Sequence, residues 1–323
     1  MLFKALTHIA TRSGPEARLS VLLYHRVLDR PDPLRPTTPD AEMFGRHMRW
    51  LCDQFSVMSL TEAVDRLREG SLPPRAAAVT FDDGYRDNAT NAAPILRDAG
   101  LSATVFVNTA YLDGRVPFFE LITDLVRGFD GERLDLEDWG LGCHEMGTDD
   151  QRSSAIDAIC GQLKYLAGDR CDRYVAEIAQ REGVPITGDL MLDEAALGTL
   201  VDAGLEIGSH GHDHFILSTL SPHEARDQLA RSRDIIASMT GAAPRFYAYP
   251  NGKRGIDFDD THIEMVKDAG YDAAFAADDG VCCSTEQLFS LPRFGPWATN
   301  GLRFKTQMLC NALGVYEKET STA

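Results

Sequence analysis

AAAVTFDDGY, residues 76–85, is the stretch from which the fold can be worked out. Its first six residues, Ala76 to Phe81, are small, apolar or β-branched, which is typical of a strand buried on both faces. Asp82 and Asp83 follow, and adjacent carboxylates repel each other unless a cation or a proton is shared. A metal ion with a base beside it is one explanation. Because Asp-Asp-Gly is also ordinary turn chemistry, a plain turn is the other.

Similar short apolar runs recur along the chain and alternate with helical patterns. The further strand candidates are residues 20–24, 103–107, 205–209, 246–249, 273–276 and 289–291. The helix candidates are residues 41–55, 60–69, 89–98, 193–203, 222–240 and 260–269. Strands that alternate with helices predict an α/β fold with parallel strands. About seven strands suit a distorted (β/α) barrel better than a symmetric eight-stranded one.

Residues 115–187 break this rhythm, with helical patterns over 118–127 and 153–182 and no convincing strand. We therefore expect a domain over 20–295 with a helical insertion at about 115–187, between an N-terminal segment 1–19 and a C-terminal tail 296–323. An insertion after the third strand would lie near the carboxyl ends of the strands, where it could cap a substrate cleft. An insertion with a purely structural role, and no part in the substrate cleft, is an equally weighted alternative.

The charge and the composition indicate which classes of binding partner and which compartment the protein has. The formal net charge of −17 argues against nucleic acid, which needs basic patches to displace counterions. Seven scattered cysteines without a Cys-x-x-Cys pair predict a reducing compartment, the cytoplasm, rather than a disulfide framework. No apolar run approaches the roughly 20 residues of a transmembrane helix. The opening segment, residues 1–12, could still form a short amphipathic helix that contacts a membrane surface.

A second strand end carries histidines. LEIGSHGHDH, residues 205–214, ends with three histidines in five residues. The imidazoles of His210 and His214 are four residues apart, and in a tight loop both can turn towards one divalent ion. A carboxylate from the Asp82–Asp83 pair would complete three protein ligands and leave one carboxylate spare. The metal would lower the pKa of a bound water, and the spare carboxylate would take its proton as the water attacks a carbonyl.

At these motifs the sequence resembles the polysaccharide deacetylase family, the NodB-homology domains of carbohydrate esterase family four. Residues 80–84, Thr-Phe-Asp-Asp-Gly, look like its first motif, which implies Asp82 as the catalytic base and Asp83 as a metal ligand. His210 and His214 look like the two histidines of its second motif, although Gly211 stands where the family usually has Ser or Thr. The resemblance runs from about residue 20 to 293 outside the insertion and implies a distorted barrel.

Two further motifs depart from the family pattern. FYAYPNG, residues 246–252, is similar to the third motif in the variant that carries aromatic-Pro in place of an arginine, and Ala248 stands where that arginine would be. The resemblance implies that the Asn251 backbone N–H helps to hold the oxyanion. Leu-Pro-Arg293 stands where many members have Leu-x-His, whose histidine is the general acid. Three candidates for the general acid therefore remain: His25, His212, and Asp82, which could return the proton that it took as the base. The resemblance to the branch acting on poly-N-acetylglucosamine begins at His25-Arg26.

The sequence thus predicts a metal-dependent hydrolase that removes an N-acetyl group from an amino sugar in a glycan or glycan precursor. Zinc is the expected metal, with cobalt, nickel, manganese and iron as alternatives. Tyr249, His212 and Arg293 are expected to contact the substrate. The alternatives are hydrolysis of another amide, such as a small amide or formamide, iron-dependent oxygen chemistry, and a non-catalytic, metal-dependent glycan-binding protein. The oligomeric state is not predicted.

Overall fold

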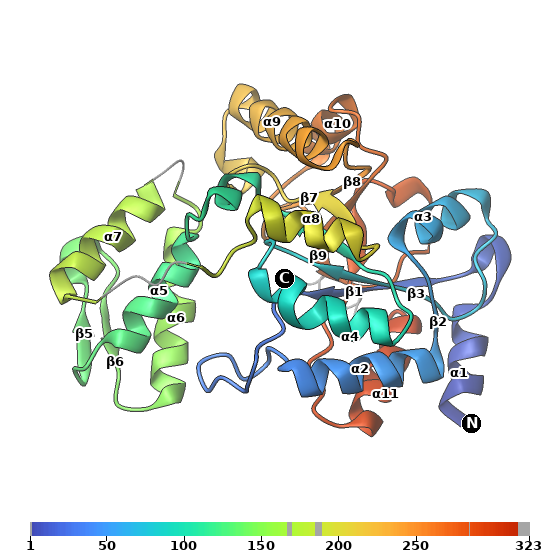
Figure 1. The fold of residues 1–323 in the computed structure, drawn as a ribbon, viewed down its shortest axis with the longest axis horizontal. Helices are drawn as coiled ribbons and strands as arrows, with labels where there is room; N and C mark the ends of the chain where they lie inside the picture. Colours follow the sequence, from blue (N-terminus) through green and yellow to red (C-terminus); the bar gives the residue numbers. More distant parts are fainter. Residues whose placement is uncertain (1, 167–169, 185–188, 284, 316–323) are drawn as a thin grey trace.

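The computed structural model describes residues 2–166, 170–184, 189–283 and 285–315, and at its centre is a nearly closed barrel of seven parallel strands (Figure 1). Around the barrel the order is β1 (Leu19–Tyr24), β3 (Ala76–Phe81), β4 (Thr104–Val107), β7 (Glu206–Ser209), β8 (Phe246–Ala248), β9 (Ala273–Asp279) and β10 (Leu291–Arg293). The two-residue β2 (Ser56–Val57) pairs with β3. Phe294, just after β10, bonds to β1 through Val21 O (2.8 Å) and Leu23 N (2.9 Å). The predicted fold class is confirmed.

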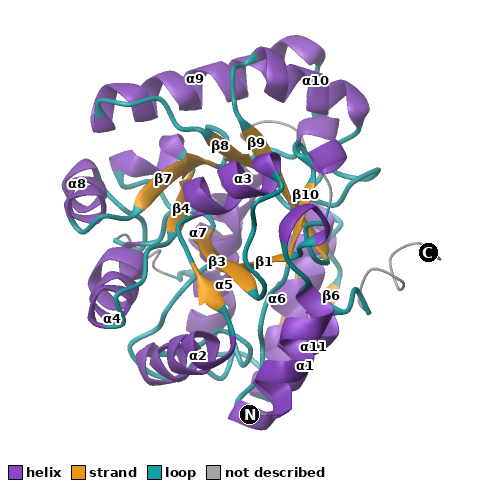
Figure 2. Ribbon diagram, turned by 90° about the vertical axis from the view of Figure 1, so that its right-hand side faces the viewer, coloured by secondary structure: helices purple, strands orange, loops and turns teal. Residues whose placement is uncertain are grey.

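Helices surround the strands, which Figure 2 shows end-on. The helices expected from the sequence form as α2 (Ala41–Gln54), α3 (Leu60–Glu69), α4 (Ala93–Asp98), α8 (Glu194–Asp202), α9 (Pro222–Thr240) and α10 (Asp260–Asp268). Residues 88–92, the start of the expected 89–98 helix, form a π-helical turn instead. Local chemistry sets the other ends: Ser221 and Glu224 form a capping box before α9, and Gly241 ends it with φ 77°.

The small residues of β3 have a packing reason. Ala76 and Ala78 face a core cluster that contains Phe106 and Phe275, whereas Val79 and Phe81 face the cluster beneath the helices. The rings of Phe106 and Phe275 lie 5.7 Å apart. Because a Cβ atom at Gly208 would lie 2.4 Å from the ring of Phe106, β7 needs glycine at that position. Large side chains from two strands thus fill the barrel and require small ones on the others.

The insertion forms a lobe with its own hydrophobic core, at the left of Figure 1. It contains α5 (Phe118–Gly128), α6 (Asp149–Leu163), α7 (Arg170–Glu182) and the antiparallel pair β5 (Arg133–Asp135) and β6 (Cys143–Glu145). The expectation of no strand in this region is wrong, because strands of three residues are too short to show an alternating pattern. The expected helix over 153–182 is divided into α6 and α7. The domain boundaries stay a prediction.

The two ends of the described chain are helical. α1 (Leu2–Thr11) packs on α2 and on α11 (Gly301–Ala312). Ile9 on α1 is 72% exposed, so part of this helix presents an apolar side chain to solvent. Across the described ranges, no helix combines the length and the apolar character needed to cross a bilayer. Contact of α1 with a membrane surface stays a prediction.

A buried histidine joins α2 to the barrel and links stability to pH. The ring of His47, 2% exposed, lies 2.8 Å from Ala298 O through Nε2 and 3.1 Å from the Tyr24 hydroxyl through Nδ1. A neutral ring that donates from Nε2 and accepts at Nδ1 satisfies both contacts. Burial lowers the pKa of His47, and the bond to Ala298 O offsets only part of this effect.

We expect the free energy of unfolding to fall as the pH drops below about 6.5 towards the lowered folded pKa of His47, because only the unfolded chain then binds the extra proton. This one group contributes a slope of at most about 1.4 kcal/mol per pH unit. His47→Gln still offers one donor and one acceptor but does not titrate, so its unfolding free energy in urea should lose this component between pH 7.5 and 5. The exposed His223→Gln is the control. Equal slopes in the two variants would contradict the assignment.

Candidate active site

The two sequence motifs meet at the carboxyl ends of the strands. Asp82 follows β3 and its N–H donates to Tyr24 O at 2.9 Å, while His210 follows β7 and its N–H donates to Val107 O at 2.9 Å. Each motif therefore continues the sheet for one residue before the chain turns away. Because all the strands are parallel, Asp82, Asp83, His210 and His214 arrive at the same end of the barrel.

Asp83 turns into the centre of this end. Its φ is 72° and that of Gly84 is 78°, so the chain reverses in the left-handed region directly after Asp82. A Cβ at Gly84 would lie 3.1 Å from Val107, so the turn also packs closely against β4. The strained backbone at Asp83 places the two neighbouring carboxylates in different surroundings.

The cluster of Asp83, His210 and His214 fits a metal ion. Asp83 Oδ1 lies 3.5 Å from His210 Nε2 and 3.3 Å from His214 Nε2. Two atoms that each lie about 2.1 Å from a tetrahedral ion are about 3.4 Å apart. Asp83 Oδ1 is buried and accepts no hydrogen bond. Among the described residues, these three form the one group of His, Cys, Asp and Glu side chains close enough to share an ion.

His210 is oriented by its second nitrogen. Nδ1 lies 2.8 Å from Ala248 O and donates to it, which leaves Nε2 directed at the carboxylates. Burial lowers the pKa of His210 to about 4, against the opposite effect of Asp82. The ring is therefore neutral near pH 7 and has a free lone pair to offer a metal ion.

The histidine loop is held by residues that the sequence motifs do not include. Gly211 has φ 81°, which favours glycine over the Ser or Thr that the family usually has there. Gln228 on α9 accepts from the N–H groups of His212 (3.1 Å) and Asp213 (2.8 Å) through Oε1. No signal in the sequence distinguishes Gln228 from other polar residues of α9.

Arg293 binds the second carboxylate. Its Nη1 and Nη2 donate to Asp82 Oδ1 and Oδ2 at 2.6 and 2.7 Å, and its Nε donates to Ala276 O at 2.9 Å. Burial alone would raise the pKa of Asp82, but Arg293 and His210 together lower it below its ordinary value. Asp82 is thus an ionised carboxylate near pH 7 with both oxygens fixed. The side chain of Arg293 has no exposed surface.

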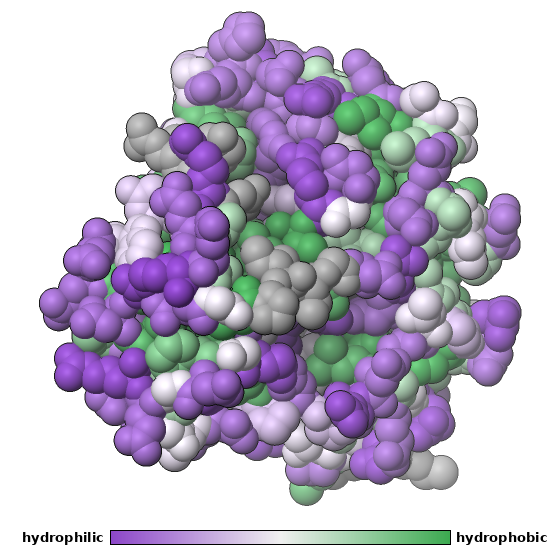
Figure 3. Space-filling view, turned by 60° about the vertical axis from the view of Figure 1, so that its left-hand side comes forward, coloured by the Kyte–Doolittle hydropathy of each residue, from purple (hydrophilic) through white to green (hydrophobic). Residues whose placement is uncertain are grey.

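A cavity of about 720 Å³ opens over these groups. The barrel contributes Asp82, Asp83, His210, His214, His25, Tyr249 and Asn251 to its lining. The loop 34–38 and the helices α5 and α6 of the insertion form the other walls. Of the two roles expected for the insertion, the structure therefore agrees with the one in which it caps the cleft. Figure 3, turned so that the insertion comes forward, shows separate patches of apolar residues, one of them near the centre, on a largely hydrophilic surface.

Two of the expected substrate contacts lie elsewhere. Neither Arg293 nor His212 lines the cavity. The guanidinium of Arg293 is buried and donates to Asp82, Ala276 and Thr80. The ring of His212, 4% exposed, lies 2.7 Å from the Thr109 hydroxyl. Tyr249 does line the cavity, although its hydroxyl donates to Phe289 O at 2.9 Å.

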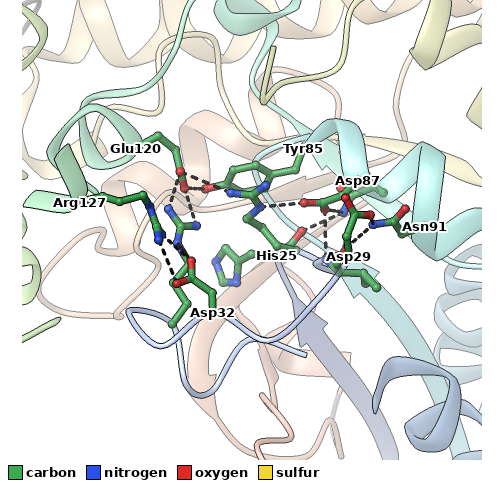
Figure 4. A network of polar contacts seen from close by, with 12 residues as sticks. His25, Asp29, Asp32, Tyr85, Asp87, Asn91, Glu120 and Arg127 are labelled. Atoms are coloured by element: carbon green, nitrogen blue, oxygen red, sulfur yellow. Dashed lines mark hydrogen bonds and ion pairs between the residues drawn. The ribbon is translucent and has the colours of Figure 1, made fainter. Parts of the chain in front are cut away.

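A buried polar network that the sequence did not reveal joins the insertion to the barrel (Figure 4). Glu120 on α5, 2% exposed, accepts two bonds from Arg35 (2.8 and 2.5 Å) and one from the Tyr85 hydroxyl (2.7 Å). The Arg26 guanidinium lies over the Tyr85 ring, 4.8 Å from its centroid. These residues come from separate segments, so only the folded chain brings them together.

Comparisons with known proteins agree with this geometry. The family model described as "Polysaccharide deacetylase" matches residues 69–141 and 163–274, together more than half of the chain. The chain is 22% identical over 302 residues to YxkH of Bacillus subtilis, which is named as a polysaccharide deacetylase; the match covers 93% of this chain and 76% of that protein.

Two solved structures share the fold. The deacetylase PplD of Streptococcus pyogenes, solved with acetate, has a TM-score of 0.61 at 16% identity, covering 91% of this chain and 99% of that one. IcaB of Ammonifex degensii has a TM-score of 0.57 at 18% identity, covering 93% and 98%. Barrel, motifs and family model lead to one assignment: the chain belongs to the polysaccharide deacetylase family.

Proposed function

We propose that the protein removes an N-acetyl group from an amino sugar of a glycan or glycan precursor, and that it needs a divalent metal ion to do so. The observation that carries this proposal is that two adjacent carboxylates have different partners. Asp83 shares the cluster with His210 and His214, whereas Asp82 is held by Arg293 at the edge of the same cavity. A ligand beside a separate base is what hydrolysis of an amide requires.

Asp83, His210 and His214 would hold the ion, with zinc the first choice for two imidazoles and one carboxylate. When bound, such an ion supplies Lewis acidity and lowers the pKa of a coordinated water. The lowered pKa of Asp82 keeps it ionised, ready to take a proton from water that attacks the acyl carbon. Because Arg293 holds both carboxylate oxygens, Asp82 needs little reorganisation when it does so.

The leaving amine must be protonated, and the geometry favours His25 over His212 as the donor. His25 is an exposed residue on the cavity wall, close enough for its charge to act on both Asp82 and Asp83. His212 is turned away from the cavity and held by Thr109. Asp82 returning its proton is the remaining route.

Other residues of the cavity complete the proposed site. Asn251, with φ 58°, lies on the wall, where its backbone N–H would stabilise the oxyanion. Tyr249 would contact the substrate with its ring, which stacks 3.7 Å from that of Phe258. The substrate would reach these groups between the barrel and the insertion. A cytoplasmic location stays a prediction from the cysteine pattern.

A set of variants distinguishes the residues assigned as metal ligands from the residue assigned as the base. We expect Asp83→Ala and His210→Ala to lose bound metal, because each removes one of three ligands. Asp82→Asn should keep the metal and lower kcat by about 10²- to 10⁴-fold, since it removes the base. Elemental analysis and acetate release from N-acetylglucosamine oligomers and nucleotide-linked N-acetylhexosamines measure both effects.

The exposed His223→Ala serves as the control for this set and should keep both metal and activity. Full metal content in Asp83→Ala would refute the ligand assignment. If the metal-loaded protein acts on none of the sugars, the proposed substrate is wrong, and another amide or a binding role takes its place.

The Arg293–Asp82 pair predicts a change in pH dependence. In Arg293→Lys the pKa of Asp82 should rise, because a single point charge replaces two fixed donors. A base must be deprotonated to act, so the acidic limb of kcat/KM should move to higher pH, by roughly 1 unit or more. Arg245→Lys, which alters an ion pair with Asp65 and Asp272 outside the cavity, is the matched control. An unchanged acidic limb in Arg293→Lys would show that Arg293 does not control the pKa of the catalytic base.

A further inference from the structure

The loop that carries His25 is held by side chains instead of by the sheet. β1 ends at Tyr24, and the next residues have no strand partner. Asn88 Nδ2 donates to His25 O at 2.9 Å. Asp87 Oδ1 accepts from Val27 N at 3.1 Å, and Asn91 Nδ2 donates to Val27 O at 2.8 Å. Three side chains thus replace the backbone ladder over the residues that follow β1.

These three side chains belong to the segment that begins with the catalytic carboxylates. Asp87, Asn88 and Asn91 lie five, six and nine residues after Asp82. Asn88 is completely buried and Asp87 is 9% exposed. Residues Asn88–Ala92 form a π-helical turn, a feature found frequently at functional sites. The chain therefore departs from regular α-helix at the place where it supports the His25 loop.

The support extends through Arg26. Its Nε donates to Asp87 Oδ2 at 2.7 Å, and its Nη1 lies 3.5 Å from Glu120 Oε2 on the insertion. Figure 4 shows His25 between the Asp87–Asn91 side of the network and the Glu120 side. His25 itself has no side-chain bond among those described, so its position depends on how its backbone is held.

We propose that Asp87, Asn88 and Asn91 are positioning residues that fix the His25 loop against the segment carrying Asp82 and Asp83. This inference rests on the proposed function, in which His25 protonates the leaving amine. Because Asp82 N also donates to Tyr24 O at 2.9 Å, the base and His25 are attached to one another through two short segments. The distance from His25 to the reacting nitrogen is then set independently of the substrate.

A double-mutant cycle tests the inference. Asn88→Ala should lower kcat about 10- to 100-fold with little change in KM or metal content, because it lets the His25 loop move. Added to His25→Ala, the same change should have almost no further effect on kcat, since the group that it positions is gone. Asn91→Ala, at a partly exposed position, should behave in the same way and guards against misfolding of the first variant.

Asn300→Ala is the matched control, because it removes the Asn300 cap of α11 and should lower Tm without changing kcat. If Asn88→Ala lowers kcat equally in the wild-type and His25→Ala backgrounds, the positioning role is overturned. The same holds if Asn88→Ala behaves like Asn300→Ala, with a lower Tm and an unchanged kcat.

A readout that needs no activity separates this inference from the proposed function. In protein with ¹⁵N-labelled histidine, Asn88→Ala should shift the ring signals of His25 and leave those of the exposed His8 and His223 in place. Unmoved His25 signals overturn the positioning role even in an active enzyme. A protein that releases no acetate refutes the proposed function, and the ring signals then decide the positioning role alone.

Discussion

Two carboxylates, Asp82 and Asp83, lie side by side and buried at the end of β3. This arrangement costs free energy, and the other residues of the site offset that cost. The two aspartates are 3% and 5% exposed. Neither could stay ionised there without a positive partner. Arg293 supplies that partner for Asp82, while Asp83 shares with His210 and His214 a cluster in which a metal ion would be the positive partner. Separate partners give neighbouring residues of the same type different chemistry, one suited to be a base and the other a ligand.

The arginine that binds Asp82 comes from β10. In the motif that the chain resembles, an arginine stands on β8 where this chain has Ala248. Here β10 provides Arg293, and the carbonyl of Ala248 is used to orient His210. β10 and β8 are both neighbours of β9, so a side chain from either strand can reach the barrel centre. The closed arrangement of strands thus lets β10 supply the arginine that holds Asp82.

The insertion turns the open end of the barrel into an enclosed cavity. Its own hydrophobic core makes it a compact lobe, and Glu120 attaches that lobe to Arg35 and Tyr85 at the wall of the cavity. A second attachment runs from the Tyr165 hydroxyl to Asp257 at 3.1 Å. A buried carboxylate with three donors is costly to separate from its partners, which favours a fixed wall over a loose one.

The sequence by itself determined the alternation of strands and helices, the seven-stranded barrel, and the meeting of Asp82, Asp83, His210 and His214. These follow from local patterns and from the rule that parallel strands end on one side. Only the tertiary structure decided that Arg293 binds Asp82, that His25 and not His212 faces the cavity, and that Glu120, Gln228 and Asn88 support the site. Each of these depends on a contact between residues far apart in the chain, with a direction that is set by packing. Side-chain direction across such distances has no local signature, because the energy that fixes it arises only when the barrel closes.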